Sequence, residues 1–167
     1  MTAGELYFDG LCEDRNPGGI MCYAYILKAN GEVVSSGVNS APAKPDNTNN
    51  IAEYRALWTG LKALSESGKC EQITIHGDSM LVINQLTDVG GIHKPHLQIA
   101  RDSCLELLRK IGCTWSAAWI ERDLNSEADA LCRSEYKRLT GKDAPERGKK
   151  RLDNEWRRSR FYSVENG

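Results

Sequence analysis

The sequence predicts a single α/β domain built on a mixed sheet, and three observations support this. The chain has 167 residues, which is about the size of one domain. Hairpin signals come first along the chain, and strand and helix patterns alternate after them. Hairpins join antiparallel strands, whereas parallel strands need crossovers that are usually helical. One side of the sheet is therefore expected to be antiparallel and the other parallel, with helices on its faces.

Five segments have the composition of strands. Leu6 and Phe8 alternate with more polar neighbours, and Asn30-Gly31 is a strong two-residue hairpin signal. Gly10 is expected to break the first strand. The strands are predicted at residues 5–9, 20–28, 33–38, 72–76 and 114–120.

Four segments have helical periodicity. In the first of them, Leu57, Leu61 and Leu64 recur at spacings of four and three, which predicts one buried face. Asp78-Ser79 is expected to cap the second helix. The helices are predicted at residues 50–67, from the Asp78-Ser79 cap to residue 86, at residues 95–110 and at residues 125–139.

The composition excludes several classes of protein. No apolar run approaches the roughly 18 residues of a membrane helix, and the first residues lack the order of a signal peptide. We therefore expect a cytoplasmic, monomeric protein that does not bind membranes. Six cysteines are present, but no two of them lie two to four residues apart, which predicts free thiols rather than a zinc site or disulfides.

Charge is distributed unevenly along the chain. Residues 141–167 contain eight Lys/Arg against five Asp/Glu, whereas the remaining residues contain fourteen against eighteen. We therefore divide the chain into a domain of residues 1–140 and a basic C-terminal tail of residues 141–167. This tail is either a solvated extension or an arm that contacts phosphates.

Four acidic residues occupy positions that are unusual for solvated acids. Asp9 and Asp78 lie at predicted strand ends, each beside a glycine that lets a partner approach the backbone closely. Glu53 shares a helix face with apolar residues, and Asp129 lies between two alanines. Converging carboxylates repel one another unless cations hold them, and Mg²⁺ prefers such oxygen ligands. Two such ions could catalyse in-line cleavage of a phosphodiester.

The motifs around these acids resemble those of type 1 ribonuclease H. The resemblance covers about residues 5–140 in order, and it implies the ribonuclease H-like fold, a five-stranded mixed sheet flanked by helices. The motifs that carry it are Leu6-Tyr7-Phe8-Asp9-Gly10, Asn16-Pro17-Gly18-Gly19, residues 48–57, Gly77-Asp78-Ser79 and residues 125–131.

The resemblance also implies an activity and its residues. The activity would be endonucleolytic hydrolysis of the RNA strand of RNA–DNA hybrids with two Mg²⁺ ions, for which Mn²⁺ could substitute. By position, Asp9 would bridge both ions, Glu53 and Asp78 would hold the ion near the leaving oxygen, and Asp129 would hold the other. The substrate contacts implied by the resemblance are Asn16, Thr48, Asn49, Asn50, Ser79 and Met80.

Two features depart from the family pattern. The loop before the last predicted helix, residues 120–124, lacks the histidine that aids turnover in some members. Residues 89–101, where many members have a lysine-rich helix that grips the hybrid, offer only Lys94 and Arg101 as fixed positive charges. The basic tail is a candidate to compensate.

Two other functions remain open. One is a catalytically silent nucleic-acid-binding domain, and the other is a DNA-acting nuclease on the same fold. A binding domain has no need to gather acids near phosphates, which argues against the first. Asn16, Asn49 and Asn50 favour hybrids over duplex DNA, because amides can contact base edges and sugar hydroxyls in a wide, shallow minor groove.

Overall fold

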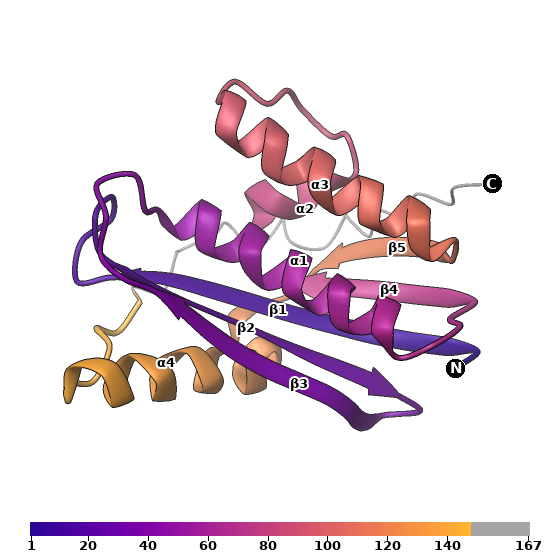
Figure 1. Cartoon of the computed structure of the whole chain (residues 1–167), viewed down its shortest axis with the longest axis horizontal. Coiled ribbons are helices and arrows are strands. Elements are labelled where there is room, and N and C mark those ends of the chain that lie inside the picture. The colour runs from indigo at the N-terminus through magenta and orange to yellow at the C-terminus, as the bar shows by residue number, and fades with distance from the viewer. Residues whose placement is uncertain (148–167) are drawn as a thin grey trace.

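The sheet has five strands and mixed direction, as predicted. The computed structural model describes residues 1–147, and the strand order is β3-β2-β1-β4-β5 (Figure 1). The strands β1 (Ala3–Glu13), β2 (Ile20–Ala29) and β3 (Glu32–Ala41) form the antiparallel side. The strands β4 (Gln72–Gly77) and β5 (Thr114–Trp119) run parallel to β1.

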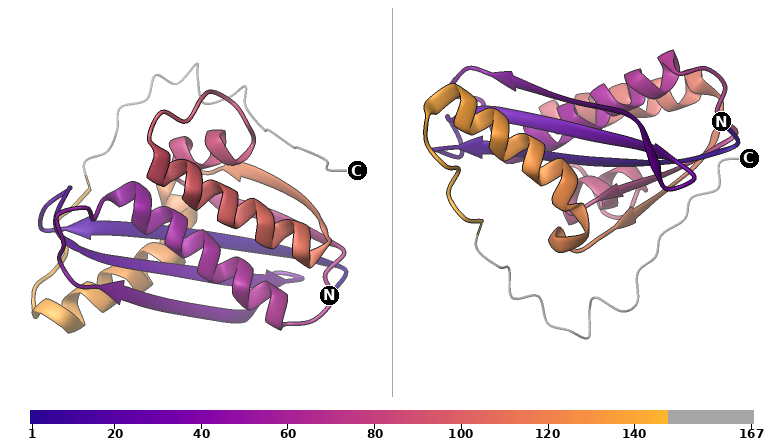
Figure 2. Two further views of the ribbon diagram at one scale, coloured as in Figure 1. Left: turned by 45° about the horizontal axis from the view of Figure 1, so that its top comes forward. Right: turned by 90° about the horizontal axis from the view of Figure 1, so that it is seen from below.

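The helices cover both faces of the sheet. The helices α1 (Asn49–Glu66), α2 (Met80–Leu86) and α3 (Pro95–Ile111) lie on one face, and α4 (Ser126–Thr140) lies on the other (Figure 2). Each element lies within a few residues of its predicted range. A short 3-10 helix, Arg122–Asn125, precedes α4 and was not predicted. None of the helices in residues 1–147 is both long enough and apolar enough to cross a membrane.

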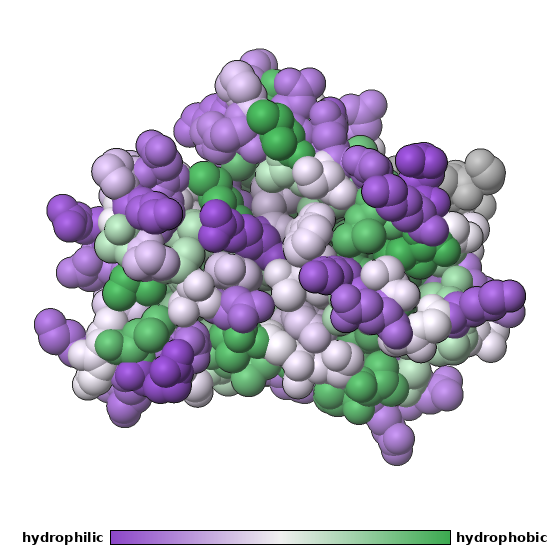
Figure 3. Space-filling view, viewed as in Figure 1, coloured by the Kyte–Doolittle hydropathy of each residue, from purple (hydrophilic) through white to green (hydrophobic). Residues whose placement is uncertain are grey.

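The main core lies between α1, α3 and the sheet. Leu57, Leu61 and Leu64 are fully buried there, so the predicted stripe of α1 is its inner face. A smaller apolar cluster lies under α4 and includes Leu11, Cys132 and Tyr136. All six cysteines are buried and free. On the face shown in Figure 3, apolar residues are scattered among hydrophilic ones instead of forming one large patch.

One strand boundary was predicted wrongly. Gly10 does not end the first strand, because β1 continues to Glu13 and pairs with β2 along its whole second half. The parallel pairing with β4, however, stops at Phe8 and Gly77. Asp9 therefore lies where the parallel side of the sheet ends, although it is in the middle of a strand.

Candidate active site

Asp9 is held in the sheet between the two helix layers. Its side chain is fully buried, and the Cys132 thiol on α4 donates a hydrogen bond to the Asp9 carbonyl oxygen at 3.3 Å. The buried Asn125 amide donates to the neighbouring Phe8 carbonyl at 2.8 Å. This backbone is therefore fixed from the α4 side.

Glu53 reaches Asp9 because Gly10 lets α1 come very close to β1. A Cβ atom at Gly10 would lie 2.3 Å from the carbonyl carbon of Ala52 and 2.4 Å from the amide nitrogen of Glu53. The partner that approaches the Gly10 backbone is thus α1 itself. The Glu53 side chain is nearly fully buried beside β1.

Asp78 follows the last residue of β4. Gly77, just before it, makes room for the Phe8 ring, since a Cβ there would lie 2.4 Å from that ring. The Trp119 indole N–H donates to the Asp78 carbonyl at 3.1 Å and anchors the turn into α2. Both glycines beside the acids therefore make room for packing within the protein.

The structure brings three of the four predicted acids together. One carboxylate oxygen each from Asp9, Glu53 and Asp78 lies within 4.8 Å of the others. A second kind of evidence is that Asp9 Oδ2, Glu53 Oε2 and Asp78 Oδ2 are buried and accept no hydrogen bond from residues 1–147. Buried acceptors are normally satisfied, so these oxygens are suited to a hard cation.

Asp129 lies at the margin of this cluster. Its Oδ2 accepts a hydrogen bond from Arg133 one turn later at 3.0 Å, while its Oδ1 is buried without a partner among the described residues. The Asp129 charge nevertheless contributes to raising the pKa values of Asp9 and Asp78. It is thus close enough to act on the cluster electrostatically.

Burial is the main cause of the perturbed acidity of the cluster. Burial, supported by repulsion from Asp78 and Asp129 and opposed by Arg147, raises the pKa of Asp9 to about 7. The pKa of Glu53 is raised well above its ordinary value, first by burial and then by the charges of Asp9 and Asp78. The pKa of Asp78 is raised by burial as well, although Arg147 and Arg122 oppose the shift. These carboxylates need a positive charge to be ionised together.

Comparison with known proteins places this chain in a family. The reverse transcriptase-like family model matches residues 7–135, a span that contains all four acids. The chain belongs to this family. Ribonuclease HI of Halobacterium salinarum is 35% identical over 125 residues, which are 75% of this chain and 60% of that protein. The chain thus spans about three fifths of the length of this curated relative.

Solved structures show the same fold. The crystal structure of RNase H1 from Halobacterium salinarum superposes with a TM-score of 0.72 at 32% identity, covering 84% of this chain and 99% of that one. LC11-RNase H1, solved in complex with an RNA/DNA hybrid, superposes with a TM-score of 0.73 at 22% identity, covering 82% and 99%. The predicted ribonuclease H-like fold is therefore confirmed.

Three of the predicted substrate contacts, Thr48, Ser79 and Met80, lie at two helix N-termini. Thr48 caps α1, and its hydroxyl accepts a hydrogen bond from the Ile51 amide at 3.2 Å. Ser79 caps α2 in the same way through Val82 at 3.3 Å, and Met80 is the first residue of that helix. Both hydroxyl groups thus have a structural role, which leaves their contact with substrate a prediction.

The predicted asparagine contacts lie beside the cap of α1. The Asn16 side-chain oxygen accepts a hydrogen bond from the Asn49 amide at 3.1 Å, and the Asn49 side-chain oxygen accepts one from the Cys12 amide at 2.7 Å. These two bonds join the loop after β1 to the start of α1. Asn50, in the first turn of α1, is partly exposed. The buried Asn47, which the sequence analysis missed, donates to the Gly19 and Pro42 carbonyls at 2.8 Å each.

Two arginines at the acid cluster were not predicted. Arg147 donates from Nη1 to Asp9 Oδ1 at 3.1 Å and from Nη2 to the Gly10 carbonyl at 2.8 Å. Arg122 forms an ion pair with Asp78 in which Nε and Oδ2 are 3.5 Å apart. The tail was identified by its charge, but its composition did not predict which of its residues would contact an acid. Residues 148–167, which hold the rest of it, lie outside the described residues.

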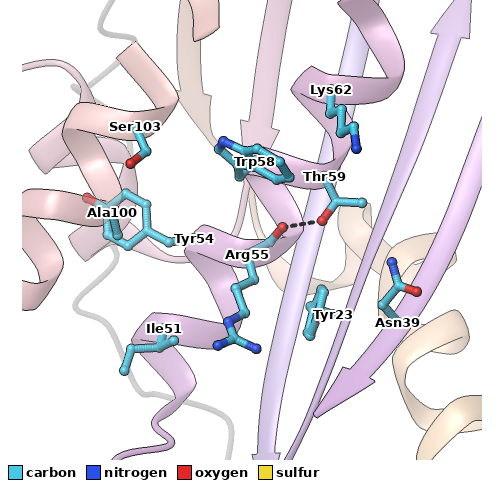
Figure 4. Close-up of a pocket in the computed structure, with 10 residues that line it drawn as sticks. All are labelled: Tyr23, Asn39, Ile51, Tyr54, Arg55, Trp58, Thr59, Lys62, Ala100 and Ser103. Atoms are coloured by element: carbon cyan, nitrogen blue, oxygen red, sulfur yellow. Dashed lines mark hydrogen bonds between the residues drawn. The ribbon is translucent and has the colours of Figure 1, made fainter. Parts of the chain in front are cut away.

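A separate groove runs along the outer side of α1. It has a volume of about 540 Å³ and is lined by residues of α1, α3 and the antiparallel strands, none of which is a predicted site residue (Figure 4). Its cations lie over aromatic rings, with Arg55 5.8 Å from the centre of the Tyr23 ring and Lys62 5.7 Å from that of Trp58. The acid cluster is not part of this groove.

Proposed function

We propose that this chain is a metal-dependent ribonuclease H that hydrolyses the RNA strand of RNA–DNA hybrids. The observation that carries the proposal is the convergence of Asp9, Glu53 and Asp78 within 4.8 Å. Similarity to Ribonuclease HI, and the likeness of the fold to an RNase H1 solved with an RNA/DNA hybrid, support the choice of reaction and substrate. Cytoplasmic location and a monomeric state stay predictions.

The residues fit a pair of divalent ions, Mg²⁺ or, as a substitute, Mn²⁺. Asp9, Glu53 and Asp78 would hold one ion, and Asp9 with Asp129 would hold the other. When bound, such ions activate a water nucleophile and stabilise the charge on the leaving oxygen. The protein contributes rigid positions for the ligands, through Asn125 and Cys132 behind β1 and through Trp119 behind Asp78.

The surface beside the acids suits a hybrid duplex. Asn16, Thr48, Asn49 and Asn50 surround the N-terminus of α1, the helix that also carries Glu53. Amide side chains can donate and accept, so they can contact base edges and the 2′-hydroxyl that distinguishes RNA. The positive end of the helix dipole favours a phosphate at the same place.

Cleavage of labelled substrates tests the proposal. The full chain is incubated with RNA–DNA hybrid, duplex RNA and duplex DNA, each with Mg²⁺, Ca²⁺ or EDTA. We expect cleavage of the hybrid alone, in Mg²⁺, with 5′-phosphate and 3′-hydroxyl ends. Ca²⁺ should support little cleavage, because it prefers more ligands at longer distances. Cleavage of duplex DNA would favour a DNA-acting nuclease, and binding without cleavage would favour a silent binding domain.

Substitution of Asp9 links this activity to the acid cluster. Asp9→Asn keeps the shape of the side chain and removes its charge, so we expect loss of hybrid cleavage by about 10³-fold or more with an unchanged circular dichroism spectrum. Asp88→Asn is the matched control, because the Asp88 side chain is 92% exposed and is not part of the acid cluster. Normal activity of Asp9→Asn in Mg²⁺ would reject the assignment.

A further inference from the structure

Arg147 is carried to the acid cluster by an ordered turn after α4. Gly141 ends α4 in the left-handed conformation, with φ of 71°. Ala144 is buried in the same apolar cluster as Leu11 and Tyr136, and its carbonyl accepts a hydrogen bond from Arg133 Nη1 at 3.2 Å. The segment that ends in Arg147 is thus packed against α4 and β1.

The guanidinium of Arg147 is bound as a cation among acids. Its two hydrogen bonds go to Asp9 Oδ1 and to the Gly10 carbonyl, and its side chain is only 14% exposed. Its charge also acts on Glu53 and Asp78, both of which raise its pKa. Arg147 therefore acts on all three carboxylates, each of which has a buried oxygen that accepts no hydrogen bond within residues 1–147, and Arg122 adds an ion pair to Asp78.

This contact conflicts with the use of Asp9 as a metal ligand. Under the proposed function, on which this inference rests, Asp9 would contribute a ligand to both ion positions. Oδ1 accepts the hydrogen bond from Arg147, and a guanidinium next to a divalent ion would also be repelled by it. We propose that Arg147 is a tethered cation that occupies one of the divalent-ion positions at Asp9, so that metal binding must displace it.

This arrangement has two consequences for the full chain. Arg147 offsets repulsion among buried carboxylates, and it thereby stabilises the fold when divalent ions are scarce. It also weakens metal binding, because part of the binding free energy is spent on breaking its two hydrogen bonds. The metal concentration needed for half-maximal activity should therefore depend on a residue that is not itself a metal ligand.

Titration calorimetry on the full chain tests the competition directly. Mg²⁺ and Mn²⁺ are titrated separately into the wild type, Arg147→Ala and Arg147→Gln, with Arg138→Ala as the matched control. The Arg138 side chain is 67% exposed and pairs with Glu135 on α4, and neither residue is in the acid cluster. We expect both Arg147 variants to bind metal about tenfold more tightly, the value of a charge-assisted hydrogen bond, and the control to bind like the wild type.

Melting temperatures separate competition from a structural role. In EDTA, both Arg147 variants should melt below the wild type, and saturating Mg²⁺ should remove most of that difference. An equal decrease in EDTA and in Mg²⁺, with an unchanged metal dissociation constant, would show that Arg147 only fastens the segment and would overturn the inference.

The same titrations distinguish this inference from the proposed function. If Asp9→Asn abolishes metal binding while Arg147→Ala leaves the dissociation constant unchanged, the metal site stands and the competition is rejected. If neither the wild type nor the Arg147 variants bind metal, the proposed function fails and the inference fails with it. Binding that appears or strengthens only in the Arg147 variants supports the competition.

Discussion

Gly10 determines how closely Glu53 can approach Asp9. Gly10→Ala would place a Cβ 2.3 Å from the backbone of Ala52, and backbone cannot move aside as a flexible side chain can. We expect a loss of about 1–3 kcal/mol in the free energy of unfolding, as for other overpacked sites. Hybrid cleavage should decrease further, because a displaced α1 moves Glu53 away from the other acids.

Urea unfolding and cleavage assays on the same protein measure both effects. Gly91→Ala is the control, since Gly91 is exposed and its nearest neighbour for a Cβ is the His93 ring at 3.7 Å. It should change the free energy of unfolding by less than about 0.5 kcal/mol. Wild-type stability and activity in Gly10→Ala would show that α1 can shift without cost.

For single residues, the sequence predicted the acids but not the residues that contact them. Asp9, Glu53 and Asp78 could be found because each lies beside a glycine or on an apolar helix face. The contact of Arg147 with Asp9 spans 138 residues and depends on the turn after α4, which no local pattern specifies. The hydrogen bond from the buried Asn125 amide to Phe8 could not be predicted either, because asparagine before a helix is also an ordinary cap residue.

Thr48 has two predicted roles at the N-terminus of α1, one in the stability of the helix and one in substrate binding. It caps α1, whose first turn contains no acidic residue, and it is also a predicted substrate contact at the helix end that favours a phosphate. Thr48→Asp separates the two roles. Aspartate caps helices well and interacts favourably with the helix dipole, so stability should be kept, whereas its charge should repel the phosphate and raise KM several-fold.

Two companion variants complete this comparison. Thr48→Ser should keep both stability and KM, and Thr48→Ala should lose about 1 kcal/mol of stability through loss of the cap. The measurements are the thermal unfolding transition and the steady-state kinetics on a hybrid. An unchanged KM in Thr48→Asp would limit Thr48 to its structural role.

Most elements could be predicted because their signals are local. Hairpin asparagine and glycine, apolar periodicity and cap residues placed all five strands and four helices. The length of β1 could not be predicted in this way, because glycine is by composition a strand breaker. Gly10 is kept in the strand by pairing with Tyr23 of β2 and by contact with α1. Tertiary contacts thus overrode a local preference.

For the whole molecule, the open question is what the rest of the basic tail contributes. The sequence left open whether residues from 141 onward form a solvated extension or an arm that assists hybrid binding, and six Lys/Arg follow position 148. Truncation after Gly148 removes them while it keeps the buried Ala144 and the contact of Arg147. We expect a higher KM, little change in kcat and a smaller dependence of binding on salt, by about one unit of log–log slope for each lost phosphate contact.

The melting temperature of this truncated protein tests the alternative, in which the removed residues have a structural role. If the removed residues pack on the domain, the melting temperature should decrease and the salt dependence should stay the same. Truncation after Thr140 would not separate these outcomes, because it also removes Ala144 and Arg147. An unchanged salt slope would reject a role of the tail in holding phosphates.

The turn that returns Arg147 to β1 has a consequence for newly made protein. A ribosome releases the chain from its N-terminus, and domains begin to fold as they emerge. All four acids, from Asp9 to Asp129, leave the ribosome before Arg147 does. If the acid cluster binds metal as proposed, a nascent domain would expose it to the ions of the surrounding solution before Arg147 has emerged.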